Sequence, residues 1–167
     1  RVRIGRWNVP GKPTAILVDF KQFLTKQNEI LTEFWKRFGV DSLTGNWDYR
    51  ESALFGYAAG RVIESFWRYN LDSSDKVVAQ FHEWMTGTGL LYLKSVNVPI
   101  ATVFTTHATV IGRCIAGNYL PLYDGIHGYD ADEKARQFNV VARHSLEKKA
   151  AQYSDIFTTV SDITAQE

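Results

Sequence analysis

Hydrophobic and polar positions in the first part of the chain alternate over two short stretches and then take a helical spacing. Residues 2–9 alternate apolar and polar side chains, and residues 14–18 are almost entirely apolar. Both stretches predict β-strands, the second more buried than the first, with a proline- and glycine-rich turn at 10–13 between them. Apolar side chains then recur at helical spacing over 22–38, where a glycine follows, and over 49–70. These two segments predict helices.

The remainder of the chain alternates short apolar runs with helical segments. The predicted elements are a strand at 77–81, a helix at 86–96, a strand at 99–104, a long glycine-containing loop at 107–130, a helix at 132–153, a strand at 156–160 and a helix that opens at Asp162. An alternation of strand and helix predicts a parallel α/β sheet flanked by helices, with right-handed crossovers. The chain has no internal repeat and no low-complexity tract.

Glycines and tryptophans give two expectations about packing. Gly56 and Gly60 interrupt the predicted helix at 49–70. Glycine costs a helix about 1 kcal/mol relative to alanine, so we expect these two to mark close packing on the sheet. Aromatic residues make up 14% of the chain, with five tryptophans. Large aromatic side chains favour the core over a sugar-stacking surface, so we expect the tryptophans to be mainly core residues.

Length, charge and cysteine content narrow the classes of function. A chain of 167 residues suits one domain, and its 19 basic and 18 acidic side chains leave no basic field for binding nucleic acid or an anionic membrane. A single cysteine, Cys114, excludes an internal disulfide and fits a reducing compartment, so a cytoplasmic protein is expected. The chain begins without methionine and ends in what reads as a helix start, which predicts a piece of a longer protein.

Polar side chains follow the last three predicted strands. His82 and Glu83 follow the strand at 77–81, Thr106 and His107 follow the next one, and the pair 161–162 (Ser-Asp) follows the last. In an open α/β sheet, ligands bind just beyond the carboxyl ends of the strands. We therefore expect the first two groups to line a functional site, and the third to cap the following helix.

The sequence lacks the motifs typical of dinucleotide-binding, phosphate-binding and zinc-binding proteins. No Gly-x-Gly-x-x-Gly fingerprint follows a strand, and the Gly-x-x-x-x-Gly-Lys-Ser/Thr phosphate loop is absent from the sequence. The four histidines share no zinc-ligand spacing, and one cysteine cannot complete a structural zinc site. No metal site and no cofactor are therefore expected, although a metal held by His82, Glu83 and His107 remains a competing hypothesis.

Three collinear motifs resemble the eukaryotic-type glycogen synthase family. They are residues 80–84 (Gln-Phe-His-Glu-Trp), residues 103–113 (Val-Phe-Thr-Thr-His-Ala-Thr, then Gly-Arg after two more residues) and residues 157–161 (Phe-Thr-Thr-Val-Ser). The resemblance covers essentially the whole chain. It implies that residues 1–167 are a single, partial N-terminal Rossmann-like domain of a two-domain (GT-B) glycosyltransferase. The loop at 118–124 departs from the eukaryotic pattern and favours a bacterial member.

The family's activity implies roles for particular residues. Its members transfer glucose from UDP-glucose to the non-reducing end of an α-1,4-glucan with retention of configuration, so the donor is a substrate and no cofactor is implied. By this resemblance, His107 faces the donor glucose and Arg113 contacts the sugar nucleotide. His82, Glu83 and Thr106 are expected to line or support the same cleft. No residue of the chain is assigned as the catalytic group itself.

Parts of the family's pattern are missing. The N-terminal Gly-Gly loop with its lysine has no counterpart, and neither has the second domain, so the chain alone is expected to be inactive. The strand before that loop would lie between the strands at 14–18 and 77–81. Without it the sheet has open edges, so we expect a gap closed by altered strand pairing, a partner chain that supplies the strand, or a longer protein that contains it; of these, self-association is favoured. The competing hypotheses are a non-catalytic carbohydrate-binding module and an unrelated nucleotide-binding α/β domain.

Overall fold

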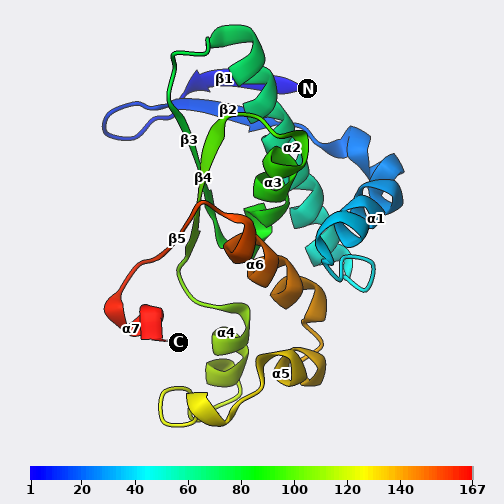
Figure 1. The fold of residues 1–167 in the computed structure, drawn as a ribbon, viewed down its shortest axis with the longest axis vertical. Coiled ribbons are helices and arrows are strands. Elements are labelled where there is room, and N and C mark those ends of the chain that lie inside the picture. Colours follow the sequence, from blue (N-terminus) through cyan, green and yellow to red (C-terminus); the bar gives the residue numbers. More distant parts are fainter. Residues whose placement is uncertain (167) are drawn as a thin grey trace.

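The strands form two separate sheets in the computed structural model, which describes residues 1–166 (Figure 1). β1 (Val2–Arg6) and β2 (Thr14–Val18) pair antiparallel as a hairpin. β3 (Val77–His82), β4 (Ile100–Thr106) and β5 (Ile156–Thr159) form a parallel sheet in the order β3-β4-β5. This second sheet confirms the predicted parallel α/β arrangement.

The hairpin departs from the sequence-based expectation. β1 ends at Arg6 rather than at residue 9: the backbone N–H of Trp7 still donates to the Pro13 carbonyl at 2.9 Å, but Pro13 has no N–H with which to continue the ladder. β2 is more buried than β1, as predicted, but none of its residues is fully buried, and Leu17 is 69% exposed. Within residues 1–166, β2 pairs with β1 and leaves β3 at an edge of the parallel sheet. The gap expected between residues 14–18 and 77–81 is thus not closed by β2.

The helices begin and end at recognisable caps. The Asn46 side chain accepts the backbone N–H of Tyr49 at the start of α2, and Gly39, with φ 68°, ends α1 as its sequence predicts. No helix in the described part of the chain is both long enough and apolar enough to cross a membrane. The helical elements are η1 (Lys21–Lys26), α1 (Gln27–Phe38), α2 (Trp47–Asn70), α3 (Glu83–Val96), α4 (Val110–Gly117), η2 (Ile126–Gly128), α5 (Ala131–Gln137), α6 (Val141–Tyr153) and α7 (Asp162–Gln166).

Helices α1, α2, α3 and α6 gather on one side of the parallel sheet and form the main core with it (Figure 1). The fully buried side chains of this core include Leu31, Leu54, Leu90, Phe104 and Leu146. A second, smaller core joins α4 to α5 through Ile111, Ile115 and Ala135. The expectation for the tryptophans holds only in part: Trp7, Trp35 and Trp47 are each more than half exposed, whereas Trp67 and Trp84 are partly buried and pack against the main core.

Gly56 and Gly60 mark close packing, but their partner is α3 rather than the sheet. A Cβ placed on Gly60 would lie 2.8 Å from the Gly89 carbonyl oxygen, and one on Gly89 would lie 2.6 Å from the Gly56 carbonyl oxygen. Next to this contact, the Thr88 hydroxyl donates to the Ala53 carbonyl at 2.6 Å. The glycines therefore allow two helix backbones to touch, and α3 is held between α2 and the sheet.

Two predictions for the second half of the chain, one of a loop and one of a single long helix, are wrong. The segment predicted as a loop at 107–130 contains α4, with Thr109 as its N-cap. The helix predicted at 132–153 is two helices, α5 and α6, which are separated at Asn139. Asn139 has φ 56°, and the next backbone N–H, of Val140, donates to the Ala135 carbonyl at 2.9 Å. This pattern ends a helix, because a left-handed residue turns the chain away from the axis.

Asp155 fixes the start of β5 against β4. Its carboxylate accepts the backbone N–H of Thr102 at 2.7 Å and the Thr102 hydroxyl at 2.9 Å. Lys94 of α3 donates to the same oxygen at 2.7 Å. The hydrogen bond from Lys94, followed by those from Thr102, lowers the pKa of Asp155 to about 2. One exposed carboxylate thus ties together α3, β4 and β5.

Candidate functional site

The carboxyl ends of β3 and β4 bring two histidines together. His82 ends β3 and His107 follows β4, and the parallel register places His82 opposite Thr105. Nδ1 of His82 lies 3.1 Å from Nε2 of His107. One of these nitrogens donates and the other accepts, so at least one of the two rings is neutral. The expectation that the residues following these strands meet at one edge of the sheet is confirmed.

Glu83 joins this histidine pair to α4. Its Oε1 accepts the backbone N–H of His107 at 2.9 Å and lies 3.5 Å from Nη2 of Arg113. Glu83 begins α3 with φ 62°, a left-handed conformation that costs a residue other than glycine about 1–3 kcal/mol. Residues with strained backbone conformations cluster at active sites and ligand-binding sites. The side chain is 13% exposed and thus mostly shielded from solvent.

Arg113 lies one turn inside α4 and points its charge into solvent. Thr109 caps this helix by accepting the Gly112 backbone N–H at 2.9 Å, and the N–H of Arg113 itself donates to the Thr109 carbonyl. The Arg113 side chain is 61% exposed, and its contact with Glu83 is long. Because an exposed ion pair of this kind is weak, the guanidinium remains available to an anion.

Thr106 and Glu147 form the buried floor behind these residues. The Thr106 side chain is 2% exposed, and its hydroxyl makes no hydrogen bond. Thr106 therefore lies beneath the site rather than on its surface. Glu147, on α6, is 7% exposed, and its Oε2 accepts the Val110 backbone N–H at 2.9 Å. Burial is the main cause that raises the pKa of Glu147 to about 7, and the charge of Glu83 acts in the same direction. The Val110 hydrogen bond, the nearby Thr106 hydroxyl and the charge of Arg113 oppose this rise.

Glu147 was missed by the sequence-based reasoning. Its neighbours Ala142, Leu146 and Ala150 are buried at helical spacing, and Glu147 lies at the edge of that apolar stripe. A charged residue at the margin of a buried helix face is a signal that the sequence does contain. It is easily read as part of a solvated surface, because Lys148 and Lys149 follow it directly.

Trp84 and Ser161 of the motifs, and Arg143 and His144 of α6, make structural contacts. Trp84 stacks on the buried Tyr49 at 6.0 Å between ring centroids, and the Arg143 guanidinium lies 5.2 Å from the Trp84 ring. His144 pairs with Asp132 of α5 at 2.9 Å. The Ser161 hydroxyl accepts the Thr164 backbone N–H at 3.2 Å, which confirms the predicted helix cap.

Cavities and ligand clusters do not by themselves mark this site. A cavity of about 650 Å³ between η1, α1, α2 and α3, lined by Phe23, Tyr57 and Arg61 among others, is not lined by His107 or Arg113. A smaller one of about 280 Å³ lies beside α4 and is lined by Thr109 and Glu147 among others. Residues 1–166 contain no group of three or more His, Cys, Asp or Glu side chains arranged to hold a metal ion.

Comparisons with known proteins match the chain along its whole length. The family model described as "Glycogen synthase" matches residues 1–167. The "Glycogen [starch] synthase" of Dictyostelium discoideum is 36% identical over 166 residues, which cover 99% of this chain and 18% of that protein. The "Glycogen [starch] synthase isoform 2" of Saccharomyces cerevisiae is 34% identical, over 98% of this chain and 23% of that protein. The "Glycogen [starch] synthase, liver" of Mus musculus is 33% identical, over 100% of this chain and 23% of that protein. The chain thus spans about a fifth of the length of these relatives.

Proposed function

Because the chain belongs to the glycogen synthase family, we propose that it forms part of the N-terminal domain of a retaining glycosyltransferase. The parent enzyme transfers glucose from UDP-glucose to the non-reducing end of an α-1,4-glucan such as glycogen. The chain supplies one wall of the active-site cleft, and a second Rossmann-like domain supplies the other. The enzyme works in the cytoplasm and needs no cofactor, since the nucleotide sugar carries its own leaving group.

The observation that carries this proposal is the arrangement around Glu83. One carboxylate holds the backbone of His107 and lies beside the guanidinium of Arg113, at the carboxyl edge of a parallel sheet. Ligands of open α/β sheets bind at this edge. Two residues that the family resemblance assigns to the donor are thus brought together by a third from the same set of motifs.

The chemistry of a retaining transfer suits these groups. As the bond between the anomeric carbon and the diphosphate breaks, negative charge grows on UDP and positive charge grows on the sugar ring. Arg113 keeps its charge at any physiological pH and offers five donors to phosphate oxygens, so it stabilises the departing UDP. We expect the ring or the carbonyl of His107 to hydrogen-bond a sugar hydroxyl. The hydrogen bond between the two histidines holds the His107 ring in a fixed orientation.

The test is mutation in the full-length enzyme with UDP-glucose and glycogen. Removing a charged contact made in the transition state costs about 10²- to 10³-fold in rate, so we expect Arg113→Ala and His107→Ala each to lower kcat/KM on that scale. Arg136→Ala, which removes an exposed arginine from α5, is the matched control and should leave kcat/KM unchanged.

Two outcomes contradict the proposal. Near-normal turnover in both Arg113→Ala and His107→Ala, with circular dichroism spectra like the wild type, would show that these residues do not serve the donor. Turnover by the isolated chain of residues 1–167 would show that the active site is not divided between two domains. Half of a cleft lacks both the full nucleotide site and the closure that excludes water, so we expect none.

The competing hypothesis of a non-catalytic carbohydrate-binding module is less well supported. The relatives that match the chain bear the names of synthases and not of binding modules. Tryptophan fluorescence titrated with maltooligosaccharide in the absence of UDP separates the two hypotheses, because a binding module would respond to the saccharide alone.

A further inference from the structure

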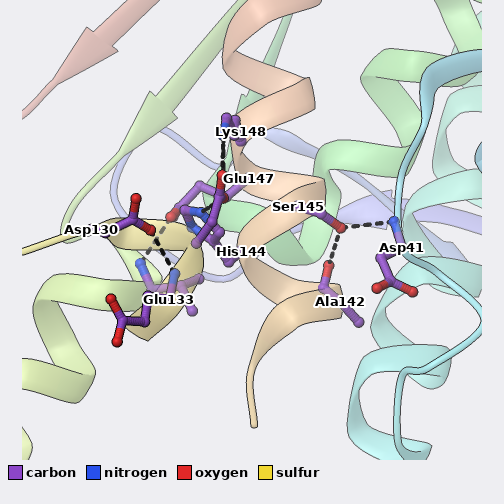
Figure 2. Close-up of polar contacts among 10 residues, drawn as sticks. Asp41, Asp130, Glu133, Ala142, His144, Ser145, Glu147 and Lys148 are labelled. Atoms are coloured by element: carbon purple, nitrogen blue, oxygen red, sulfur yellow. Dashed lines mark hydrogen bonds and ion pairs between the residues drawn. The ribbon is translucent and has the colours of Figure 1, made fainter. Parts of the chain in front are cut away.

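Helix α4 begins on a carboxylate that comes from a distant helix. The first backbone N–H groups of a helix have no partner within it. In α4, the Gly112 N–H is satisfied by the Thr109 side chain, whereas the Val110 N–H donates to Oε2 of Glu147, 37 residues later in the chain. Figure 2 shows Glu147 on α6 together with His144 and Lys148, and Ser145 directed toward Asp41.

The position of Glu147 is costly for a carboxylate. The side chain is only 7% exposed, and its second oxygen, Oε1, has no hydrogen-bond partner of good geometry among the described residues, although the Thr106 hydroxyl acts on this carboxyl. Burial of a charge without full pairing destabilises a fold, and burial is the main reason why the pKa of this carboxyl rises to about 7. A group whose ionised form weakens the fold is poorly explained as a stabilising cap. Thr109 already caps the helix.

The charges that face Glu147 from other helices are those of the candidate site. Glu83 of α3 and Arg113 of α4 both act on its ionisation, in opposite directions. On α6 itself, His144 and Lys148 line the same small cavity, but both are paired with Asp132 of α5, at 2.9 Å and 3.0 Å. The ionised carboxylate of Glu147 is therefore favoured by Arg113 and opposed by Glu83, the two residues that meet beside His107.

We propose that Glu147 is a positioning residue for the sugar-nucleotide site, which fixes the first turn of α4 and through it the reach of Arg113. The proposal rests on the proposed function for the part that concerns substrate. Val110, whose N–H it holds, lies three residues after His107 and three before Arg113. A charged acceptor at a helix N-terminus binds the N–H more strongly than a neutral one. Protonation of Glu147 therefore loosens the start of α4 without any contact with the donor.

The first measurement is the pH dependence of kcat and KM for UDP-glucose in the full-length enzyme, from about pH 5.5 to about pH 8.5. We expect kcat/KM of the wild type to rise through the neutral range, and this rise to be lost in Glu147→Gln, which keeps an acceptor but no charge. Glu147→Ala should lower kcat/KM by about 10- to 100-fold, the scale of a small misplacement of a binding group. Glu133→Gln, which neutralises an exposed glutamate on α5, is the matched control and should behave as wild type.

The second measurement is amide hydrogen exchange at residues 110–113, which needs no activity. Glu147→Ala should speed exchange at Val110 by about tenfold relative to the Glu133→Gln control. Glu147→Gln should give Val110 the same protection against exchange that the wild type shows at low pH. This variant also keeps the test valid if the alanine variant fails to fold. Unchanged exchange in both Glu147 variants overturns the proposal whatever the activity does.

The kinetic results separate this inference from the proposed function. A wild-type pH profile in Glu147→Gln overturns the positioning role, even where Arg113→Ala is inactive and the proposed function stands. Normal turnover in Arg113→Ala overturns both, because α4 then carries nothing that the donor requires.

Discussion

The contact between α2 and α3 gives the sharpest stability prediction. Gly89→Ala adds a Cβ that would lie 2.6 Å from the Gly56 carbonyl oxygen and 2.8 Å from the Phe81 ring. The first of these is backbone of another helix, so no side-chain rotation can relieve the clash. Overpacking of this kind costs about 1–3 kcal/mol, and we expect the upper end, because two helix axes must move apart.

The gain in helix propensity offsets part of that cost. Alanine stabilises a helix interior by about 1 kcal/mol relative to glycine. The expected net loss is therefore about 2 kcal/mol, which corresponds to a decrease in Tm of about 4–8 °C for a domain of this size.

Gly117→Ala is the matched control for this prediction. Gly117 is also helical, at the end of α4, and an added Cβ there has no atom within 4 Å. Its stability should be equal to or slightly above that of the wild type. Urea denaturation followed by circular dichroism measures both variants. A Gly89→Ala protein as stable as the Gly117→Ala protein would refute the view that the two backbones touch.

Two further predictions concern Asp155 and the sheet edge. Asp155→Ala leaves the buried Thr102 N–H and hydroxyl without their acceptor and should cost about 1–3 kcal/mol. Lys94→Ala removes only the charged partner of an ion pair whose carboxylate is half exposed, and it should cost less than about 1 kcal/mol in the same urea assay; equal losses would contradict this prediction. Because its folded-state pKa of about 2 lies below the usual 3.8, the contribution of Asp155 is present above about pH 4 and is lost as the pH falls toward 2, a dependence that the alanine variant should lack. The unpaired edge of β3, where Val78 is 64% exposed, predicts self-association of the isolated chain, and light scattering that shows a stable monomer at high concentration would refute it.

Short-range patterns were sufficient for the parts of the fold that depend on neighbours in sequence. The strands around Val103 and Phe157 are short apolar runs bounded by polar residues, and both lie where the pattern predicts. The meeting of His82 and His107 also followed from sequence, because parallel strands end at a common edge. The roles assigned to His107 and Arg113 toward a donor stay predictions.

The features that the sequence did not predict depend on contacts between residues far apart in the chain. Helix α4 has only eight residues, two of them glycine, and it is held by Thr109 and by Glu147 from 37 residues away. The exposure of Leu17 depends on which strand lies beside β2, and alternation of residue types carries no such information. The left-handed φ of Glu83 likewise follows from its ties to β4 and α4 and not from any preference of glutamate.

Asn139 is a local signal for a helix end, but the helical periodicity on both sides of it outweighed this signal in the prediction. Asparagine tolerates the left-handed conformation better than most residues, and here it ends α5. The helical periodicity on both sides of it favoured one continuous helix, since α5 and α6 each present apolar residues to a core. Helix α5 contributes Ala135 to the smaller core, whereas α6 contributes Ala142, Leu146 and Ala150 to the main core, and the sequence does not show that the two helices serve different cores.

The separate hairpin of β1 and β2 bears on how the chain unfolds. Its strands share hydrogen bonds with each other and none with the parallel sheet, and β1 buries no side chain. A unit with so little buried surface opens at a lower free energy than the body of the domain. Unfolding of residues 1–166 is then expected to be less than fully cooperative. The main denaturation transition would then report the unfolding of the helices and the parallel sheet alone. Its m-value would reflect only the surface that these elements expose on unfolding.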